Sequence, residues 1–478
     1  MSEIFSNQNQ NAALPVEKAY TISFQTLGCK VNRYETDAVR QAFEEHGFKV
    51  ITGAEPVDVY VINTCTVTAE ADRKSRQMIR RARRNNPKAI VVAMGCQVEL
   101  LKSASEADIS VGTKNRLSVV DRVLEQIGKT SMPAAVIPVQ SNRYEEAVCI
   151  DKPSAETGLV RNQFQEFGPV LSQEETRAYI KIEDGCDSFC SYCIIPFARG
   201  RVVSRDAAEV IREAEELGRR GFHEIVLTGI HICSFGKDKG EGISALESLL
   251  FDLDKIPSIH RIRLGSLEPN SMNEDFIQSI SRLNKLCPHF HISLQSGSDT
   301  VLARMNRKYD TKVYREVISL FRRNFDDFAV TTDIIVAFPG ETADEHKESL
   351  QFCREMNFSR IHVFPFSERS GTKAAGMQPK VTAETAGQRR DDFLCLSREL
   401  ADAHCAAMIG SQAEVLIETR DEKNNYIGYT KQYVRVNIIS QEEYTQGTEV
   451  SVHMESFEDG ELFGRIAGKV ERVFLCFS

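Results

Sequence analysis

The sequence of 478 residues lacks the long apolar runs that mark membrane proteins and exported proteins. No uninterrupted apolar stretch approaches 18 residues, which excludes a conventional transmembrane helix. The first twenty residues have neither the basic start nor the apolar core of a signal peptide, so we expect a cytoplasmic protein. An excess of positive charge is also missing, because the formal net charge is −9. This argues against a general nucleic-acid coat, although a local basic patch is enough to bind RNA.

The overall composition is that of an ordinary globular protein. Hydrophobic residues make up 42% of the sequence and charged residues 27%, and the length suggests about three domains. The chain has 13 cysteines. In a cytoplasmic protein they point to metal binding or catalysis more than to disulfides.

Three closely spaced cysteines follow a strand-like run at residues 178–182. Cys186, Cys190 and Cys193 are separated by three residues and then by two. Soft thiolates favour iron–sulfur clusters, zinc or Cu(I), and a cubane held by three cysteines keeps one iron open to a substrate. The alternative is a zinc site with a distant fourth ligand, but zinc motifs normally pair two short Cys or His spacings. We therefore expect an iron–sulfur cluster here, and these cysteines are the candidate catalytic residues.

A second set of cysteines lies in the N-terminal region. Cys29, Cys65 and Cys96 each follow a short apolar run, and the runs alternate with helix-like segments, which predicts a doubly wound parallel α/β sheet. Parallel sheets place their ligands at the carboxyl ends of the strands, so these thiols are expected to converge on a second metal cluster. Any one of them alone is more simply a small buried residue. The expected strands cover residues 21–24, 57–62, 89–93 and 108–111.

A basic helix is predicted just after Cys65. Eight cations lie between residues 73 and 88, including Arg80, Arg81, Arg83 and Arg84. In a protein of net negative charge this run is a candidate phosphate-binding surface. A solvated helix face is the simpler alternative.

The remaining chain divides into two parts. Residue 406 begins a region of about five short alternating strands with polar turns, which predicts a small antiparallel β-barrel. Tyr429 and Arg435 there offer aromatic and cationic contacts suited to RNA, or are half-buried strand residues. The part before it has six strand–helix units, too few to close an eight-stranded barrel. Its expected strands cover residues 178–183, 224–228, 260–265, 289–295, 329–337 and 360–366.

Several of these motifs together resemble one enzyme family. The spacing of the cysteines at 186–193 resembles the signature of radical S-adenosylmethionine (SAM) enzymes. LGCKVNRYETD, VINTCTVTAEADRKSRQ and GCQ, which contain the three N-terminal cysteines, resemble the first domain of the methylthiotransferases, and the first two motifs are similar to the threonylcarbamoyladenosine tRNA branch. Met94 and Glu99 depart from the third motif of the family, and Ala337 departs from a usual glycine.

The resemblance implies a fold and a set of cofactors. The expected fold is α/β plus β: the N-terminal α/β domain, an open (β/α)6 partial TIM barrel, and a TRAM domain, which is an OB-like RNA-binding β-barrel. The cofactors are SAM and two 4Fe-4S clusters, one on each set of three cysteines. The residues expected to contact SAM are Thr228, Gly229, Glu268 and Gln295.

The resemblance also implies domain limits. They are a disordered leader at 1–19, the N-terminal domain with the auxiliary cluster at 20–130, a connector at 131–171, the radical SAM core at 172–405 and the TRAM domain at 406–472.

The implied function is methylthiolation of a tRNA base, at C2 of N6-threonylcarbamoyladenosine next to the anticodon (tRNA position 37), with two SAM used per product. An aromatic C–H has no acidic proton and no leaving group, so a radical cofactor is needed. The implied partners are the tRNA anticodon loop, a one-electron donor such as flavodoxin or ferredoxin, and a sulfur source. The alternatives are methylthiolation of isopentenyladenosine in tRNA or of a ribosomal-protein aspartate, and a non-catalytic iron–sulfur RNA-binding regulator.

Overall fold

The structure is a computed structural model that describes residues 19–102, 104, 106–129, 163–422 and 424–470. The predicted leader, apart from its last residue, and most of the predicted connector lie outside these residues. In the N-terminal part, five parallel strands form a sheet in the order β2-β1-β3-β4-β5. The strands are β1 (Thr21–Thr26), β2 (Lys49–Val50), β3 (Val59–Thr64), β4 (Ile90–Gly95) and β5 (Ile109–Val111). The helices are α1 (Lys30–Glu45), α2 (Ala69–Asn85), α3 (Cys96–Leu101) and α4 (Ser118–Lys129).

Both faces of this sheet are covered, which explains the near-continuous apolar sequence of β3. Val61 faces a core formed with α1 and α4, and its neighbour Ile62 faces a second core formed with α2. A strand buried on both sides needs apolar residues at successive positions. The predicted doubly wound sheet is therefore confirmed, and β2 is a short edge strand that sequence reasoning missed.

Six parallel strands form the central barrel, as predicted. Two sheets, β10-β9-β6 and β11-β12-β13-β14, are joined by backbone hydrogen bonds from Ile262 to Lys285 (2.7 Å) and from Cys287 to Ile262 (2.8 Å). Among the described residues no ladder joins β6 to β14, so the barrel is open on that side. The strands are β6 (Ala178–Lys181), β9 (Glu224–Thr228), β10 (Arg261–Leu264), β12 (His289–Ile292), β13 (Ala329–Val336) and β14 (Arg360–Pro365), with short β7 (Glu183–Asp184), β8 (Val203–Ser204) and β11 (Ser266–Leu267).

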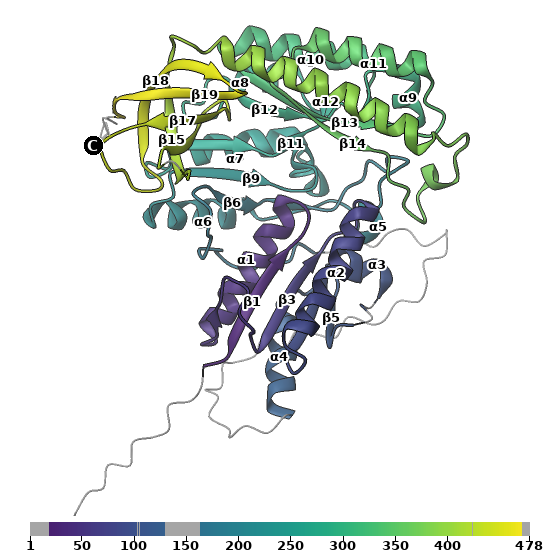
Figure 1. Ribbon diagram of the computed structural model, residues 1–478, viewed down its shortest axis with the longest axis vertical. Helices are drawn as coiled ribbons and strands as arrows, with labels where there is room; N and C mark the ends of the chain where they lie inside the picture. The colour runs from purple at the N-terminus through teal and green to yellow at the C-terminus, as the bar shows by residue number, and fades with distance from the viewer. Residues whose placement is uncertain (1–18, 103, 105, 130–162, 423, 471–478) are drawn as a thin grey trace, which may run out of the picture.

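Helices cover the outer face of these strands (Figure 1). Leu249, Phe321 and Phe393 are among the apolar residues that these helices contribute to one extended core outside the barrel strands. The helices are α6 (Ala207–Arg219), α7 (Ile243–Asp254), α8 (Glu274–Ile280), α9 (Asp299–Arg304), α10 (Thr311–Asn324), α11 (Ala343–Met356) and α12 (Ala383–Ala406), and a short α5 (Ile195–Arg199) follows the first strand.

The C-terminal part is a small closed barrel in the order β15-β16-β17-β19-β18. The prediction of a small barrel is confirmed, but one pair, β17 with β19, is parallel. The reason is that the hairpin of β18 and β19 returns beside β17 and closes the barrel with β15 on its other edge. The strands are β15 (Gln412–Arg420), β16 (Tyr426–Thr430), β17 (Arg435–Ile439), β18 (Glu449–Glu458) and β19 (Glu461–Lys469).

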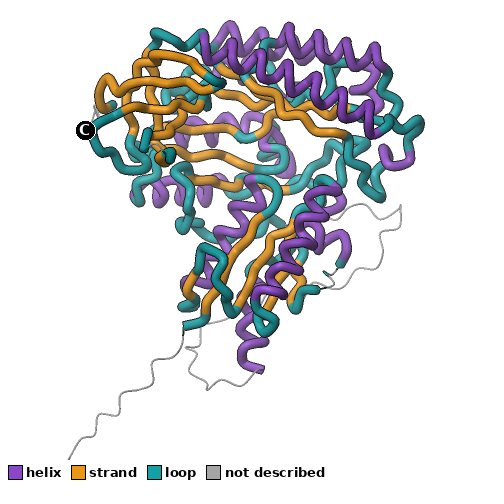
Figure 2. The backbone as a smooth tube through the Cα atoms, in the orientation of Figure 1, coloured by secondary structure: helices purple, strands orange, loops and turns teal. Residues whose placement is uncertain are grey.

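The N-terminal part and the small C-terminal barrel each pack against the central barrel (Figure 2). Helix α1 packs beside β6, at the open side of the barrel, and the small C-terminal barrel lies at another edge. Parallel β1, β3 and β4 therefore direct their carboxyl ends toward the central barrel. Within the described residues, no helix combines the length and the apolar character needed to span a bilayer.

Candidate functional site

The first candidate site is the loop that leads from β7 to α5. Cys186 donates its backbone N–H to Gly200 O (3.1 Å), and Cys193 donates its backbone N–H to Cys190 O (3.0 Å). These hydrogen bonds stabilise the backbone of the loop that carries all three cysteines. Burial raises the pKa of Cys186 to about 11 and that of Cys193 to about 12. The charge of Cys190 raises both values further. A bound cation would relieve this repulsion.

Hydrogen-bond donors reach two of these sulfurs. The Ser188 N–H donates to Cys186 Sγ (3.4 Å), and the Arg307 guanidinium donates to Cys190 Sγ (3.1 Å). Arg307 also pairs with Glu268 (2.6 Å). Such N–H···S contacts set the reduction potential of iron–sulfur clusters. Three half-buried thiols, two of them with N–H donors, fit a cluster ligated by three cysteines. Arg307 was missed in the sequence because no spacing links it to the cysteines.

Shielding of this loop comes from aromatic side chains. Tyr192 packs edge-on against Phe338 (ring centroids 6.4 Å apart), and Phe189 packs in the same way against Phe197 (6.4 Å). In the described part of the chain, no group of three or more Cys, His, Asp or Glu side chains is arranged to hold a single metal ion. A cubane binds each cysteine through a different iron, so its ligands stand farther apart than those of one ion.

The second candidate site is at the carboxyl ends of three N-terminal strands. Cys29 follows β1 and is exposed, Cys65 follows β3, and Cys96 begins α3 directly after β4. A Cβ atom added to Gly28 would lie 2.9 Å from Cys65 Sγ, so this glycine leaves room for the sulfur. Burial raises the pKa of Cys65 to about 11, and the charges of Cys29 and Cys96 add to the rise. The structure thus brings these three thiols together, and their role as cluster ligands stays a prediction.

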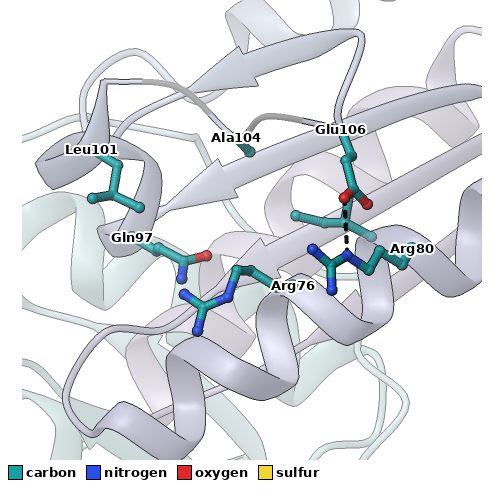
Figure 3. A pocket seen from close by; sticks show the side chains of 7 residues that line it. Arg76, Arg80, Gln97, Leu101, Ala104 and Glu106 are labelled. Carbon is teal, nitrogen blue, oxygen red and sulfur yellow. Dashed lines mark hydrogen bonds and ion pairs between the residues drawn. The ribbon is translucent and has the colours of Figure 1, made fainter.

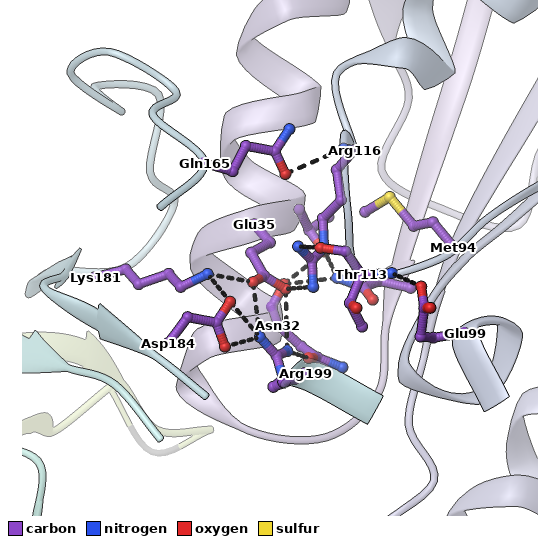
Figure 4. A network of polar contacts seen from close by, with 12 residues as sticks. Asn32, Glu35, Met94, Glu99, Thr113, Arg116, Gln165, Lys181, Asp184 and Arg199 are labelled. Carbon is purple, nitrogen blue, oxygen red and sulfur yellow. Dashed lines mark hydrogen bonds and ion pairs between the residues drawn. The ribbon is translucent and has the colours of Figure 1, made fainter. Parts of the chain in front are cut away.

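A buried ionic network joins the two cysteine sites (Figure 4). At its centre is Glu35 of α1, whose side chain has no exposure and pairs with Lys181 (2.7 Å), Arg199 (2.9 Å) and Arg116 (3.0 Å). Burial alone would raise the pKa of Glu35, but the charges of these three cations outweigh it and lower the pKa to about 2. The carboxylate is therefore ionised across the physiological range.

Arg199 connects this network to the backbone on both sides. It donates to Asn32 Oδ1 (2.7 Å) in α1 and to Asp184 (2.9 Å), two residues before Cys186. The Asn32 amide in turn donates to Leu27 O (2.7 Å) and to Thr64 O (3.1 Å), the residues that lead into Cys29 and Cys65. One guanidinium therefore fixes the loops of both cysteine sites relative to each other.

Met94 and Glu99, which depart from the third family motif, both lie in well-defined surroundings. Met94 is fully buried in the sheet core. The Glu99 carboxylate accepts the backbone N–H of Thr113 (2.9 Å), whose hydroxyl donates to Ala198 O (2.7 Å) in α5. Glu99 thus helps to hold the N-terminal part against the central barrel.

The residues predicted to contact SAM lie at the carboxyl ends of the barrel strands, on the side of the Cys186 loop. Thr228 ends β9, and a Cβ added to the next residue, Gly229, would lie 2.6 Å from the Glu183 carboxylate. Glu268 is tied to Arg307, as described above. Gln295 has a left-handed backbone (φ 71°) and pairs with β13 through Asp333 O (2.8 Å). Their role in SAM binding stays a prediction.

Two further features of this end were not foreseen. Ala337 adopts φ 60°, a conformation that costs less with glycine, which explains why an alanine is unusual there. Burial raises the pKa of Glu183 to about 8, even though it accepts the backbone N–H of His231 (2.8 Å).

The arginines of the basic helix α2 fall into two classes. Arg80 pairs with Glu106 (2.9 Å) and Arg83 pairs with Asp108 (2.5 Å), whereas Arg81 and Arg84 are exposed and have no ion-pair partner among the described residues. Two of the four predicted RNA-binding arginines are therefore paired within the protein, and the role of the helix in RNA binding stays a prediction. A pocket of about 260 Å³ lies beside the helix (Figure 3). Its lining residues are Arg76, Ile79, Arg80, Gln97, Leu101, Ala104 and Glu106.

The predicted RNA contacts of the C-terminal barrel are partly engaged within the protein. The Tyr429 and Tyr433 rings stack (centroids 5.1 Å apart), and the Arg177 guanidinium lies over both, at 5.0 and 4.7 Å. Arg435 pairs with Glu461. The tyrosines thus pack the small barrel on the central one, and their RNA role remains a prediction.

Comparison with known proteins agrees with this architecture. The fold and the cysteine loop after the first barrel strand define a radical SAM protein, and the model of the Radical SAM superfamily matches residues 180–353. The fold is shared with a solved radical S-adenosylmethionine methyltransferase, TsrM from Kitasatospora setae, at a TM-score of 0.50 and 15% identity over 75% of this chain and 77% of that chain.

Sequence relatives identify the family. The model described as uncharacterized protein family UPF0004 matches residues 21–112. The chain is 38% identical over 428 residues to the threonylcarbamoyladenosine tRNA methylthiotransferase MtaB of Bacillus subtilis, which covers 87% of this chain and 90% of that protein. It is 32% identical over 432 residues to the tRNA-2-methylthio-N(6)-dimethylallyladenosine synthase of Thermoanaerobacter pseudethanolicus, with 87% of each covered. The chain therefore belongs to the methylthiotransferase family of radical SAM enzymes.

Proposed function

We propose that the protein is a cytoplasmic tRNA methylthiotransferase that converts N6-threonylcarbamoyladenosine at position 37 to its 2-methylthio derivative and uses two SAM per product. The observation that carries the proposal is the junction of two three-cysteine sites at the carboxyl ends of two parallel sheets, linked by Arg199. The choice of threonylcarbamoyladenosine as the substrate is supported by sequence identity, which is higher to the threonylcarbamoyladenosine enzyme (38%) than to the dimethylallyladenosine enzyme (32%).

The two cysteine sites have different roles in this proposal. Cys186, Cys190 and Cys193 hold a 4Fe-4S cluster with an open iron for SAM. When bound, this cluster and SAM supply the radical that removes the hydrogen from C2 of the base. The second 4Fe-4S cluster is held by the N-terminal cysteines and carries the sulfur to be transferred. A one-electron donor such as flavodoxin or ferredoxin, and a sulfur source, complete the set of partners.

The chain's own residues position these groups and exclude water. Arg307 holds Cys190 and Glu268 together, which places the predicted SAM segment against the cluster loop. Arg199 fixes the distance between the two cysteine sites from a buried position. A fixed separation matters because both sites act on one atom of the substrate base, and small misplacements are costly in such a geometry.

The tRNA is held mainly by charge in this proposal. Arg81 and Arg84 of α2 are the strongest candidates for phosphate contacts, because they are not paired within the described chain. Arg80 and Arg83 contribute less, since Glu106 and Asp108 partly neutralise them. The TRAM-like barrel, with Tyr429 and Arg435, is the second RNA-binding part in this proposal. The target base is in a single-stranded loop, so its presentation costs less than extrusion from a duplex.

The experiment that tests this function separates radical formation from sulfur insertion. A variant with Cys29, Cys65 and Cys96 all changed to Ala should still cleave SAM to 5′-deoxyadenosine under a strong reductant. It should form no methylthio product on threonylcarbamoylated tRNA. Cys395→Ala, an exposed cysteine outside both sites, is the matched control and should keep both activities.

Mass spectrometry of the tRNA nucleosides identifies the product. The folded triple variant must first match the wild type by circular dichroism, because a bound cluster also stabilises its surroundings. A methylthio product at the wild-type rate would show that the N-terminal cysteines do not supply the sulfur. If the wild-type enzyme forms a methylthio product on isopentenyladenosine and none on threonylcarbamoyladenosine, the proposed substrate is wrong.

A further inference from the structure

The segment that follows β14 is bonded to both the central barrel and the N-terminal part. Ala374 donates its backbone N–H to Ser191 O (2.8 Å), which lies within the loop of the first cysteine site. Earlier in the same segment, the Ser367 hydroxyl accepts the backbone N–H of Ala69 (2.9 Å), the first residue of α2. Residues 367–374 therefore connect the loop of the first cysteine site to the domain that carries the second.

Arg369, within this segment, reaches the second cysteine site. Its guanidinium donates to the hydroxyl of Thr66 (2.8 Å), a buried residue that directly follows Cys65. It also pairs with the carboxylate of Asp72 in α2. The side chains of Arg369 and Asp72 are only 13% and 16% exposed. An ion pair at this depth is screened less than a surface pair, so it holds the two parts of the chain together more strongly.

Asp72 extends this contact to a second N-terminal cysteine. Its carboxylate accepts the side-chain amide of Gln97 (3.1 Å), and its backbone carbonyl accepts the same amide (3.3 Å). Gln97 is buried and directly follows Cys96. Arg369 and Asp72 together therefore fix the residues that follow two of the three N-terminal thiols.

We propose that Arg369 is a positioning residue that keeps the N-terminal thiol site at its working distance from the Cys186 loop; this rests on the proposed function. Without the guanidinium, the residues after Cys65 and Cys96 lose their tie to the barrel, whereas the Cys186 loop keeps its own backbone hydrogen bonds. SAM cleavage then continues, but fewer cleavage events lead to the methylthio product. The loss is large because a misplacement of about 1 Å lowers a rate by about 100-fold.

The test compares Arg369→Met, Arg369→Lys and Asp72→Asn with the wild type after anaerobic reconstitution. The amount of 5′-deoxyadenosine formed per methylthio product is measured on an anticodon stem-loop that carries N6-threonylcarbamoyladenosine. This ratio should rise by about 10- to 100-fold in Arg369→Met, while SAM is cleaved at about the wild-type rate. Asp72→Asn should also raise the ratio, and Arg369→Lys, which keeps the charge, should restore part of the coupling.

Glu418→Gln is the matched control. Glu418 of the C-terminal barrel pairs with Arg177 (2.8 Å) just before β6, so this ion pair also joins two parts of the chain. The Glu418 side chain is 19% exposed, close to the value for Asp72. The control should therefore lose a comparable ion pair at a different interface and keep the wild-type ratio.

A spectroscopic measurement separates this role from a simple loss of stability. When Cys186, Cys190 and Cys193 are all changed to Ala, only the N-terminal site holds a cluster, so the electron paramagnetic resonance spectrum and the midpoint potential report on that site. Adding Arg369→Met should change both at unchanged iron content, because hydrogen bonds and backbone positions around the ligands set the potential of a cluster. Adding Glu418→Gln should change neither.

The outcomes that overturn the proposal are distinct from those that overturn the function. An unchanged ratio of 5′-deoxyadenosine to product in Arg369→Met, or an unchanged spectrum, overturns the assignment. A lower melting temperature and loss of iron, with SAM cleavage and product reduced equally, also overturns it and leaves Arg369 with a role in stability alone. If the wild type forms no methylthio product on the stem-loop, the proposed function fails, and the spectroscopic comparison still decides whether Arg369 positions the thiol site.

Discussion

The strongest stability prediction concerns Glu35→Gln. The Glu35 carboxylate has no exposure and faces Lys181, Arg199 and Arg116 at 2.7–3.0 Å. The fall of its pKa from 4.5 to about 2 corresponds to about 3 kcal/mol of stabilisation, and breaking a buried ion pair typically costs about 3–5 kcal/mol. Glutamine would also point N–H donors at a guanidinium. We therefore expect a loss of about 3 kcal/mol.

Urea unfolding of the metal-free protein, followed by circular dichroism, measures this loss. At typical urea slopes it shifts the midpoint of the transition that includes the N-terminal sheet by about 1–3 M. The matched control is Glu355→Gln, which removes a half-exposed partner of Arg315 (3.0 Å) and should leave the midpoint nearly unchanged.

The pH dependence gives a second check on the same variant. The pKa of Glu35 is lower in the folded protein, so its stabilisation is complete above pH 4.5 and is lost as the pH falls toward about 2. The difference between the wild type and Glu35→Gln should therefore be constant from pH 6 to 8 and shrink below pH 4.5. A midpoint equal to that of the control, or a difference that persists unchanged at pH 3, would refute the reasoning.

Three other predictions follow from the site. Changing Cys186, Cys190 and Cys193 to Ala should lower the iron content of the reconstituted protein from about eight to about four per chain; full iron, or zinc in its place, would contradict the assignment. Arg81→Ala with Arg84→Ala should reduce the slope of tRNA affinity against salt by about two, and more than Arg80→Ala with Arg83→Ala, since the latter pair has carboxylate partners. An unchanged slope in the Arg81→Ala, Arg84→Ala variant would mean that α2 is an ordinary solvated helix face. Glu183→Gln imitates the protonated form of Glu183. The pKa of about 8 in the folded protein lies above the unfolded value, so the stability of the wild type should fall as the pH rises from 4.5 to about 8. The variant should not show this fall in melting temperature. A melting-temperature difference between the wild type and Glu183→Gln that does not change with pH would exclude the raised pKa of Glu183.

The sequence alone determined the features that depend on local pattern. Six barrel strands and the N-terminal sheet were predicted because strand periodicity and apolar runs are local properties of the chain. The spacing of Cys186, Cys190 and Cys193 is local as well, since one loop carries all three. The convergence of Cys29, Cys65 and Cys96 followed from a topological rule, that parallel strands end at one edge.

The tertiary structure decided which charged residues are partners. Glu35 and Arg199 are 164 positions apart in the chain, and Glu35 and Lys181 are 146 apart, so no periodicity could link them. The same holds for Arg307 on Cys190 and for the stack of Tyr433 on Arg177. Ion pairs and stacking depend on distance in space after the domains have packed.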